Sequence, residues 1–207
     1  EMYWLQDIVP NHMAFHPMNF RLMDVLERGD QSPYYRYFDI DWNHPAPDLK
    51  GKVMVPFLGD ELGKCIAEGQ LRLHFSEDGF SVKYFDTAYP LSLSAYPMII
   101  SMLRSHDNED SSATVLTKLV ESAPGMDYHA WDAARKQHLG SLRENEEELQ
   151  RIESLLTTIN DDQDRLHQVL DQQYYRLTYW KETEERMNYR RFFTVNELIC
   201  LRMEDEK

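Results

Sequence analysis

The interpretation of the fold starts from the stretch Trp4-Leu5-Gln6-Asp7-Ile8-Val9-Pro10-Asn11-His12-Met13-Ala14. An apolar run of strand length ends at Pro10, and Asn11 and His12 follow at once. Buried parallel strands read as nearly continuous apolar runs, and in a (β/α)8 barrel the polar residues at a strand's carboxyl end face the active site. The stretch therefore predicts a barrel strand at residues 4–9, with Asp7, Asn11 and His12 near a site. A strand end that is merely capped by polar residues is the alternative.

The composition argues against several classes of function. The 207 residues carry a net charge of −14, whereas a nucleic-acid groove needs clustered Lys and Arg to bind phosphate. Cys65 and Cys200 are far apart, so we expect neither a disulfide framework nor a zinc ribbon, and a cytoplasmic location fits. No apolar run reaches the roughly 18 residues of a membrane span. Because the histidines share no ligand spacing, no metal or other cofactor is expected.

Residues 15–95 are predicted to form a small, β-rich region with long loops. A helical pattern ends at Gly29, a strand covers residues 53–59, and a short helix covers residues 61–69. Two segments that alternate with a period of two follow within residues 71–84, separated by a turn. They predict a β-hairpin.

The region 96–181 changes to helical periodicity, with one helical pattern that starts at Pro97 and a second that runs through Val115 and Val120 and ends before Pro124. Asp127 is placed to cap a long helix, and apolar residues recur at helical spacing from Trp131 to Trp180, with one turn at residues 160–162. Two antiparallel helices, an αα-hairpin, are the simplest account of this pattern. Residues 182–207 are then a separate return segment.

Two further groups of residues are candidates for binding a ligand. Tyr37 and Trp42 lie in a segment rich in aromatic rings, where they could stack on sugar rings or belong to the core. Arg190 and Arg191 lie in a segment where aromatic and cationic residues are closely interleaved. Their guanidinium groups could order the rim of a site, or they could form structural salt bridges.

Taken together, these motifs resemble one branch of the α-amylase clan (glycoside hydrolase family 13), the maltooligosyl trehalose synthases. The resembling pieces lie in the family's order and span nearly the whole chain: Asp7 to Met13, Tyr37 to Trp42, Gly51 to Gly59, Tyr84 to Asp86, Tyr89 to Leu91, Tyr175 to Leu177, and Asn188 to Leu198. The last piece is the most specific. The chain departs from the family at Thr194, where many members have Asp, and near Cys200.

The resemblance implies an α+β fragment of a (β/α)8 barrel enzyme. Residues 1–14 would be the third barrel strand with the first conserved region, and residues 15–95 a β-rich insertion. A helical subdomain at 96–181 and a return segment at 182–207 toward the fourth strand would follow. The catalytic nucleophile and the acid/base residue are expected beyond Lys207, so no catalytic residue is expected in this chain, and the fragment alone should be inactive.

The resemblance also implies the chemistry. The parent enzyme would convert the reducing-end α-1,4 linkage of a maltooligosaccharide or starch-derived glucan to α,α-1,1, using two carboxyl groups roughly 5 Å apart. Insertions that cover the site would exclude water. His12 would hydrogen-bond a sugar hydroxyl beside Asn11, and Asp7 would orient its neighbours. The remainder of the barrel would be the chain's partner.

Two other functions are consistent with the sequence. The first is a hydrolytic relative of α-amylase that acts on maltodextrin. The second is a non-enzymatic interaction module, which would present an apolar stripe of the helices at residues 127–180 to a partner.

Overall fold

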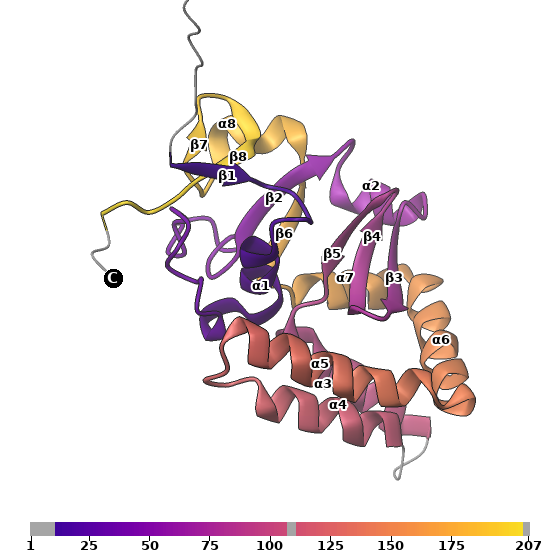
Figure 1. Cartoon of the computed structure of the whole chain (residues 1–207). Helices are drawn as coiled ribbons and strands as arrows, with labels where there is room; N and C mark the ends of the chain where they lie inside the picture. Colours follow the sequence, from indigo (N-terminus) through magenta and orange to yellow (C-terminus); the bar gives the residue numbers. More distant parts are fainter. Residues whose placement is uncertain (1–10, 107–110, 205–207) are drawn as a thin grey trace, which may run out of the picture.

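The computed structural model describes residues 11–106 and 111–204, and the predicted barrel strand at 4–9 lies outside them, as does Asp7. Within the described residues the chain is a mixed α/β fold with three small sheets (Figure 1). The sheets are β1-β8-β7, β2-β6 and β3-β4-β5, and the helices α3 to α7 gather on the side away from β1 and β8. A continuous cluster of buried apolar side chains joins the sheets to the helices, so the β-rich and helical regions share a core.

The first half of the chain forms the elements that its local patterns predict. Helix α1 (Phe20–Arg28) ends at Gly29, which has a φ of +57°, a backbone conformation that glycine adopts without a steric penalty. Strand β2 (Val53–Leu58) and helix α2 (Leu62–Ala67) follow. The predicted hairpin is confirmed as β3 (Leu71–Ser76) and β4 (Gly79–Tyr84), and β5 (Thr87–Pro90) adds a third antiparallel strand.

The helical region contains the two helices that are predicted before residue 124, followed by more helices than the predicted hairpin. Its members are α3 (Tyr96–His106), α4 (Ser111–Ser122), α5 (Tyr128–Arg143), α6 (Glu146–Asn160) and α7 (Gln163–Asp171). Asp127 caps α5 as predicted, because its carboxylate accepts a hydrogen bond of 2.8 Å from the Ala130 N–H. The αα-hairpin is wrong because Asn145 caps a new helix, accepting hydrogen bonds from the backbone N–H groups of Glu147 and Glu148.

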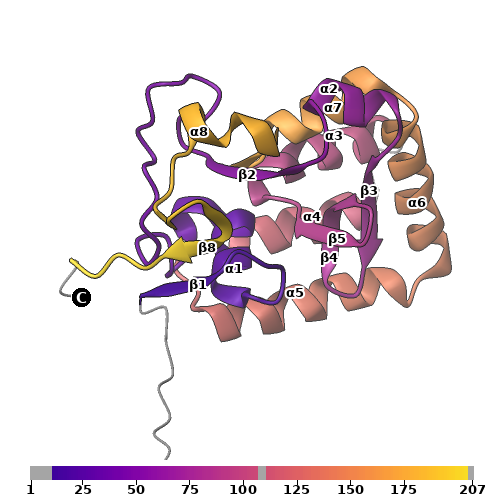
Figure 2. The ribbon, with the colours of Figure 1, turned by 90° about the horizontal axis from the view of Figure 1, so that it is seen from above.

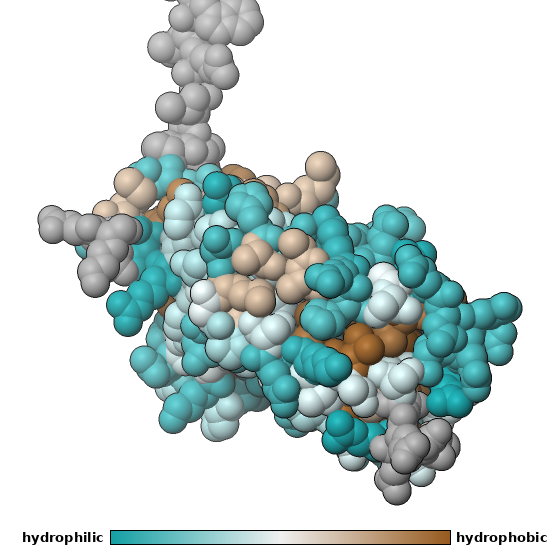
Figure 3. All heavy atoms as spheres, turned by 60° about the horizontal axis from the view of Figure 1, so that its bottom comes forward, coloured by the Kyte–Doolittle hydropathy of each residue, from teal (hydrophilic) through white to brown (hydrophobic). Residues whose placement is uncertain are grey.

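The helices α5 to α7 bury their apolar side chains. In the described part of these helices no large apolar side chain is among the exposed ones, and Trp131, Ile159 and Val169 are fully buried. Figure 3, with this end of the molecule turned forward, shows a mostly hydrophilic face whose broad apolar area lies between hydrophilic side chains. Because the large apolar side chains of α5 to α7 are buried, the exposed stripe that an interaction module needs is not found on the described part of these helices. None of the described helices is long and apolar enough to cross a membrane.

The segment after α7 is a strand, and the predicted continuation of the helix through Trp180 is wrong. Strand β6 (Tyr175–Tyr179) pairs in parallel with β2. Tyr175 and Leu177 fit a period of two as well as a helical face, and pairing with a distant strand decides between them. Parallel strands need a long crossover. Here the crossover contains α2, the β3-β4-β5 sheet and the helices α3 to α7. The helical region at 96–181 thus contributes a strand to the preceding region's sheet.

The end of the described chain returns to its beginning. After α8 (Thr183–Arg186), β7 (Arg191–Phe192) and β8 (Val195–Cys200) form a sheet with β1 (His12–Ala14). Strand β1 pairs antiparallel with β8, and His12 lies opposite Cys200. Figures 1 and 2 both show these strands side by side, at the end of the molecule away from α6. This pairing brings two motifs together that are almost 190 positions apart in sequence (from 12 to 200).

Candidate functional site

A cleft of about 530 Å³ lies where β1 and β8 meet, and we call it the histidine cleft. It is lined by Asn11, His12, Asp39, Arg190, Phe192, Cys200, Leu201, Arg202, Met203 and Glu204. Three of the residues that the sequence predicts for substrate binding, Asn11, His12 and Arg190, therefore share one cavity. Its volume lies within the range of small-molecule sites.

The backbone around β1 places the first two of these side chains. Asn11 has a φ of +61°, a left-handed conformation that asparagine tolerates better than most residues, and its carbonyl accepts a hydrogen bond of 2.8 Å from Leu201 N–H. His12 follows as the first residue of β1, and its half-buried ring packs against Phe192 with 5.3 Å between centroids and an angle of 79° between ring planes. The left-handed turn and the β8 pairing thus fix the imidazole beside the cleft.

A cluster of charges forms another wall of the histidine cleft. The Asp39 carboxylate lies 3.5 Å from Arg190 Nη1 and 4.0 Å from Arg202 Nη2, and Arg202 also donates a hydrogen bond of 2.9 Å to the Ile40 carbonyl. The Arg190 side chain is 69% exposed, so its remaining N–H groups are accessible to a ligand. Sequence reasoning missed Asp39 and Arg202 as site residues, because only long-range pairing brings them to β1.

Two carboxylates and a thiol lie among the described residues that line the histidine cleft. Among the described residues, the carboxylates that line it are Asp39 and Glu204, and Asp39 is held between two guanidinium groups. Burial, followed by the charge of Asp39, raises the pKa of the Cys200 thiol, which disfavours the nucleophilic thiolate. No group of three His, Cys, Asp or Glu side chains within the described ranges is arranged to hold a metal ion. The cleft is suited to binding by hydrogen bonds.

A second cleft of about 450 Å³, the tyrosine cleft, adjoins the first and shares Leu201, Arg202 and Met203 with it. Tyr37, which the sequence predicts to bind substrate, lines this cleft and is 41% exposed. Tyr35 lies on the same wall. The two clefts thus form adjoining cavities that share one wall.

The other two candidates lie outside both clefts. Trp42 stacks on Tyr35 with 4.4 Å between ring centroids and 19° between ring planes, so it supports the tyrosine cleft from behind. The Arg191 guanidinium donates hydrogen bonds to the Asn196 side chain and to the Thr194 carbonyl, across the turn between β7 and β8. Sugar contact by Trp42 and Arg191 stays a prediction, and in this structure both stabilise the surroundings of the clefts.

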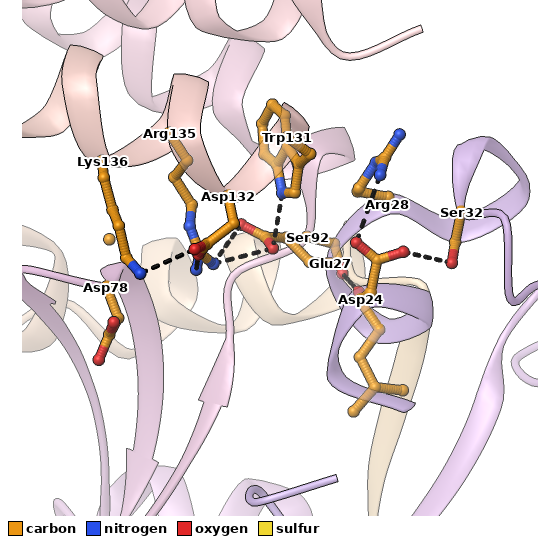
Figure 4. Close-up of polar contacts among 12 residues, drawn as sticks. Asp24, Glu27, Arg28, Ser32, Asp78, Ser92, Trp131, Asp132, Arg135 and Lys136 are labelled. Carbon is orange, nitrogen blue, oxygen red and sulfur yellow. Dashed lines mark hydrogen bonds and ion pairs between the residues drawn. The ribbon is translucent and has the colours of Figure 1, made fainter. Parts of the chain in front are cut away.

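A buried polar network anchors the segment that carries the tyrosine cleft (Figure 4). Asp24 of α1 accepts a hydrogen bond of 2.5 Å from Ser32 Oγ and lies 3.4 Å from Arg28 Nη1. Arg28, which is fully buried, donates hydrogen bonds of 2.7 Å to the Met126 carbonyl and 3.1 Å to the Ala123 carbonyl. The loop after α1 is thereby tied to the turn between α4 and α5.

The second half of this network joins α1 directly to α5 (Figure 4). The Glu27 carboxylate accepts hydrogen bonds of 3.1 Å from Trp131 Nε1 and 3.1 Å from Arg135 Nη1. Burial raises the pKa of Glu27, and although burial opposes the charge of Arg135, the carboxylates of Glu27 and Asp132 raise its pKa. The sequence offered no signal for this pair beyond two charged residues within helical segments.

Comparison with known proteins shows what the fold of this chain is similar to. No family model matches the sequence, and no curated protein matches it. Among solved structures, the fold is similar to part of the trehalose-forming synthases. One such structure, described as DSM5389 glycosyltrehalose synthase, is 30% identical with a TM-score of 0.52, and the match covers 98% of this chain and 19% of that chain.

A second structure, a maltooligosyl trehalose synthase, is 27% identical with a TM-score of 0.53. The match covers 98% of this chain and 17% of that chain. This chain therefore spans less than a fifth of the length of the synthases that it matches. The resemblance that the sequence motifs indicate is confirmed along nearly the whole chain.

Proposed function

We propose that this chain is part of an intramolecular transglycosylase that converts the reducing-end α-1,4 linkage of maltooligosaccharides to α,α-1,1. The observation that carries the proposal is the histidine cleft, in which Asn11 and His12 meet Arg190 within a chain similar to trehalose-forming synthases. We further propose that the chain begins at the third strand of a (β/α)8 barrel. It would contribute the sugar-binding rim, and the two catalytic carboxyl groups would come from outside this sequence.

The proposed reaction breaks one glycosidic bond and forms another. A nucleophilic carboxylate bonds to C1 of the maltooligosyl unit while the general acid protonates the oxygen of the departing terminal glucose. The anomeric hydroxyl of that glucose then attacks the same C1 and displaces the carboxylate from it, while the proton of the hydroxyl passes to the acid/base group. The products and reactants are isomers, so water has no place in the reaction and must be excluded.

The residues of the clefts have distinct roles in this proposal. His12 and Asn11 hydrogen-bond the hydroxyls of the sugar whose bond is broken. Arg190 donates to the same sugar or its neighbour from the opposite wall, while Tyr37 packs against the next ring along the chain. In the intact protein the insertion that this chain contributes would cover the assembled site and exclude water from it.

The experiment that tests the function is product analysis with the intact protein that contains this chain. Incubation with maltoheptaose is expected to remove the reducing end while the number of glucose units in the product stays unchanged. Glucose and maltose as main products would reject the synthase and favour the hydrolytic α-amylase relative. The 207-residue chain alone is the matched control and is expected to leave the reducing end intact.

A further inference from the structure

A row of aromatic rings runs along the surface between the described clefts. Tyr128, Phe20, Tyr34 and Tyr37 follow one another with 4.7, 6.0 and 6.1 Å between successive ring centroids. The rings come from the start of α5, the start of α1 and the loop that follows α1, so tertiary packing assembles them. Phe20 is 37% exposed and Tyr37 is 41% exposed. We call these four rings, together with Arg21, the ring track.

Arg21 lies over the ring track. Its guanidinium carbon is 4.5 Å from the centroid of Phe20, 5.7 Å from that of Tyr34 and 5.9 Å from that of Tyr37. In the described part of the chain Arg21 makes no ion pair with a carboxylate, although the sequence has 36 acidic residues. A guanidinium group has five N–H donors in a fixed plane and stacks on aromatic faces. Arg21 therefore presents donors on an aromatic surface.

Each end of the ring track leads into a cleft. Tyr37 lines the tyrosine cleft, which adjoins the histidine cleft. At the other end, Phe20 and Tyr128 line a third cleft of about 310 Å³ between α1, α5 and the turn of the β3–β4 hairpin. We call this third cleft the carboxylate cleft, because it is also lined by Asp24, Glu27 and Asp78, together with Arg135. The ring track thus joins clefts that hold both hydrogen-bond donors and hydrogen-bond acceptors.

We propose that the ring track binds the distal part of a long glucan chain whose end lies in the histidine cleft, an assignment that rests on the proposed function. The C–H face of a glucose unit packs on an aromatic face, and its hydroxyls accept hydrogen bonds from Arg21. A neutral saccharide suits this surface, since the carboxylates of the third cleft would repel an anion. In the carboxylate cleft the exposed Asp78 carboxylate offers acceptors to the hydroxyls of the farthest unit. The track selects long substrates over short ones.

The test is binding of maltoheptaose and maltotriose to the 207-residue protein, measured by calorimetry. Maltoheptaose is expected to bind at least about tenfold more tightly than maltotriose, because only the longer chain reaches Arg21. Arg21→Ala and Tyr128→Ala are expected to reduce this ratio several-fold and to leave maltotriose binding unchanged, because both residues lie beyond the part of the track that a trisaccharide reaches. Phe85→Ala is the matched control, since Phe85 is 67% exposed and lies outside the track. Thermal unfolding of each variant checks that the fold is retained.

Three results would overturn the ring track: equal affinity for the two saccharides, an unchanged ratio in Arg21→Ala, and no detectable binding of either saccharide. The proposed function fails by a different result, because product analysis of the intact protein reports on bond rearrangement. If the intact protein hydrolyses maltoheptaose while the ratio of the affinities for maltoheptaose and maltotriose is as expected, the synthase proposal is rejected and the ring track is retained. If the intact protein is a synthase and Arg21→Ala leaves the affinity ratio unchanged, the ring track alone is rejected.

Discussion

Replacing Arg135 with methionine is expected to lower the free energy of unfolding by about 3–5 kcal/mol. The reason is Glu27, whose side chain is 6% exposed and which would be left as a buried carboxylate without its guanidinium partner. The Trp131 N–H would remain as a donor but carries no charge. Chemical denaturation of the wild type and the variant at pH 7 measures the difference.

The pH dependence of this variant follows from the same carboxylate. Burial raises the pKa of Glu27 above its ordinary value of 4.5, and removal of Arg135 is expected to raise it further. A carboxyl group with a raised pKa in the folded state contributes stability that is present below pH 4.5 and is lost as pH rises through the folded-state pKa. The variant should therefore be closest to the wild type in stability at acidic pH and fall behind it as the pH rises.

Two further variants make the Arg135 prediction decisive. The double variant Arg135→Met with Glu27→Gln is expected to be more stable than Arg135→Met alone, because it leaves no buried charge. Lys136→Met removes a surface ion pair with Asp132, whose lysine is 59% exposed, and should change stability by less than about 1 kcal/mol. Equal losses for Arg135→Met and Lys136→Met would contradict the buried pair.

Asn188→Ala is expected to have the second largest effect, a loss of about 2–4 kcal/mol in the free energy of unfolding. Asn188 is 3% exposed, and its Oδ1 accepts a hydrogen bond of 2.8 Å from the Met54 N–H. Its Nδ2 donates to the Lys52 carbonyl at 2.7 Å and to the Asp41 carbonyl at 3.2 Å. Alanine leaves the buried Met54 N–H and the two half-buried carbonyls without their partner. Thermal and chemical unfolding measure the loss.

The matched control for this prediction is Asn43→Ala, because Asn43 is an exposed residue of the loop that Asn188 supports. The control is expected to stay within about 0.5 kcal/mol of the wild type. Asn188→Asp keeps the acceptor for the Met54 N–H but places a carboxylate oxygen against two carbonyls in a buried position, so a loss at least as large as that of Asn188→Ala is expected. Were Asn188→Ala as stable as Asn43→Ala, the structural role assigned to this amide would be wrong.

The elements that the sequence predicts correctly are those that interactions between residues close together in the chain determine. The helix that ends at Gly29, the β3–β4 hairpin and the cap at Asp127 depend on turns, caps and periodicity within a few residues. Strand β6 was missed because its apolar residues fit two periods, and only the distant strand β2 selects one. The break at Asn145 was missed because apolar spacing continues across it.

The residues of the candidate site also divide into those that a local motif marks and those that only distant contacts bring together. Asn11, His12 and Arg190 were identifiable because each lies in a short motif, and the structure brings them into one cleft. The ion pairs of Asp39 and the buried Glu27–Arg135 pair depend on contacts between segments far apart in the chain. No local pattern marks such residues, so sequence reasoning from one chain could not find them.

The proposed function requires His12 to contact the sugar whose bond is rearranged. In the intact protein, His12→Ala is expected to lower kcat/KM for maltoheptaose about 10- to 100-fold, because a hydrogen bond to a buried sugar hydroxyl is lost. The melting temperature should stay that of the wild type, and His16→Ala, at an exposed histidine nearby, should retain full activity. An unchanged kcat/KM in His12→Ala would contradict the claim.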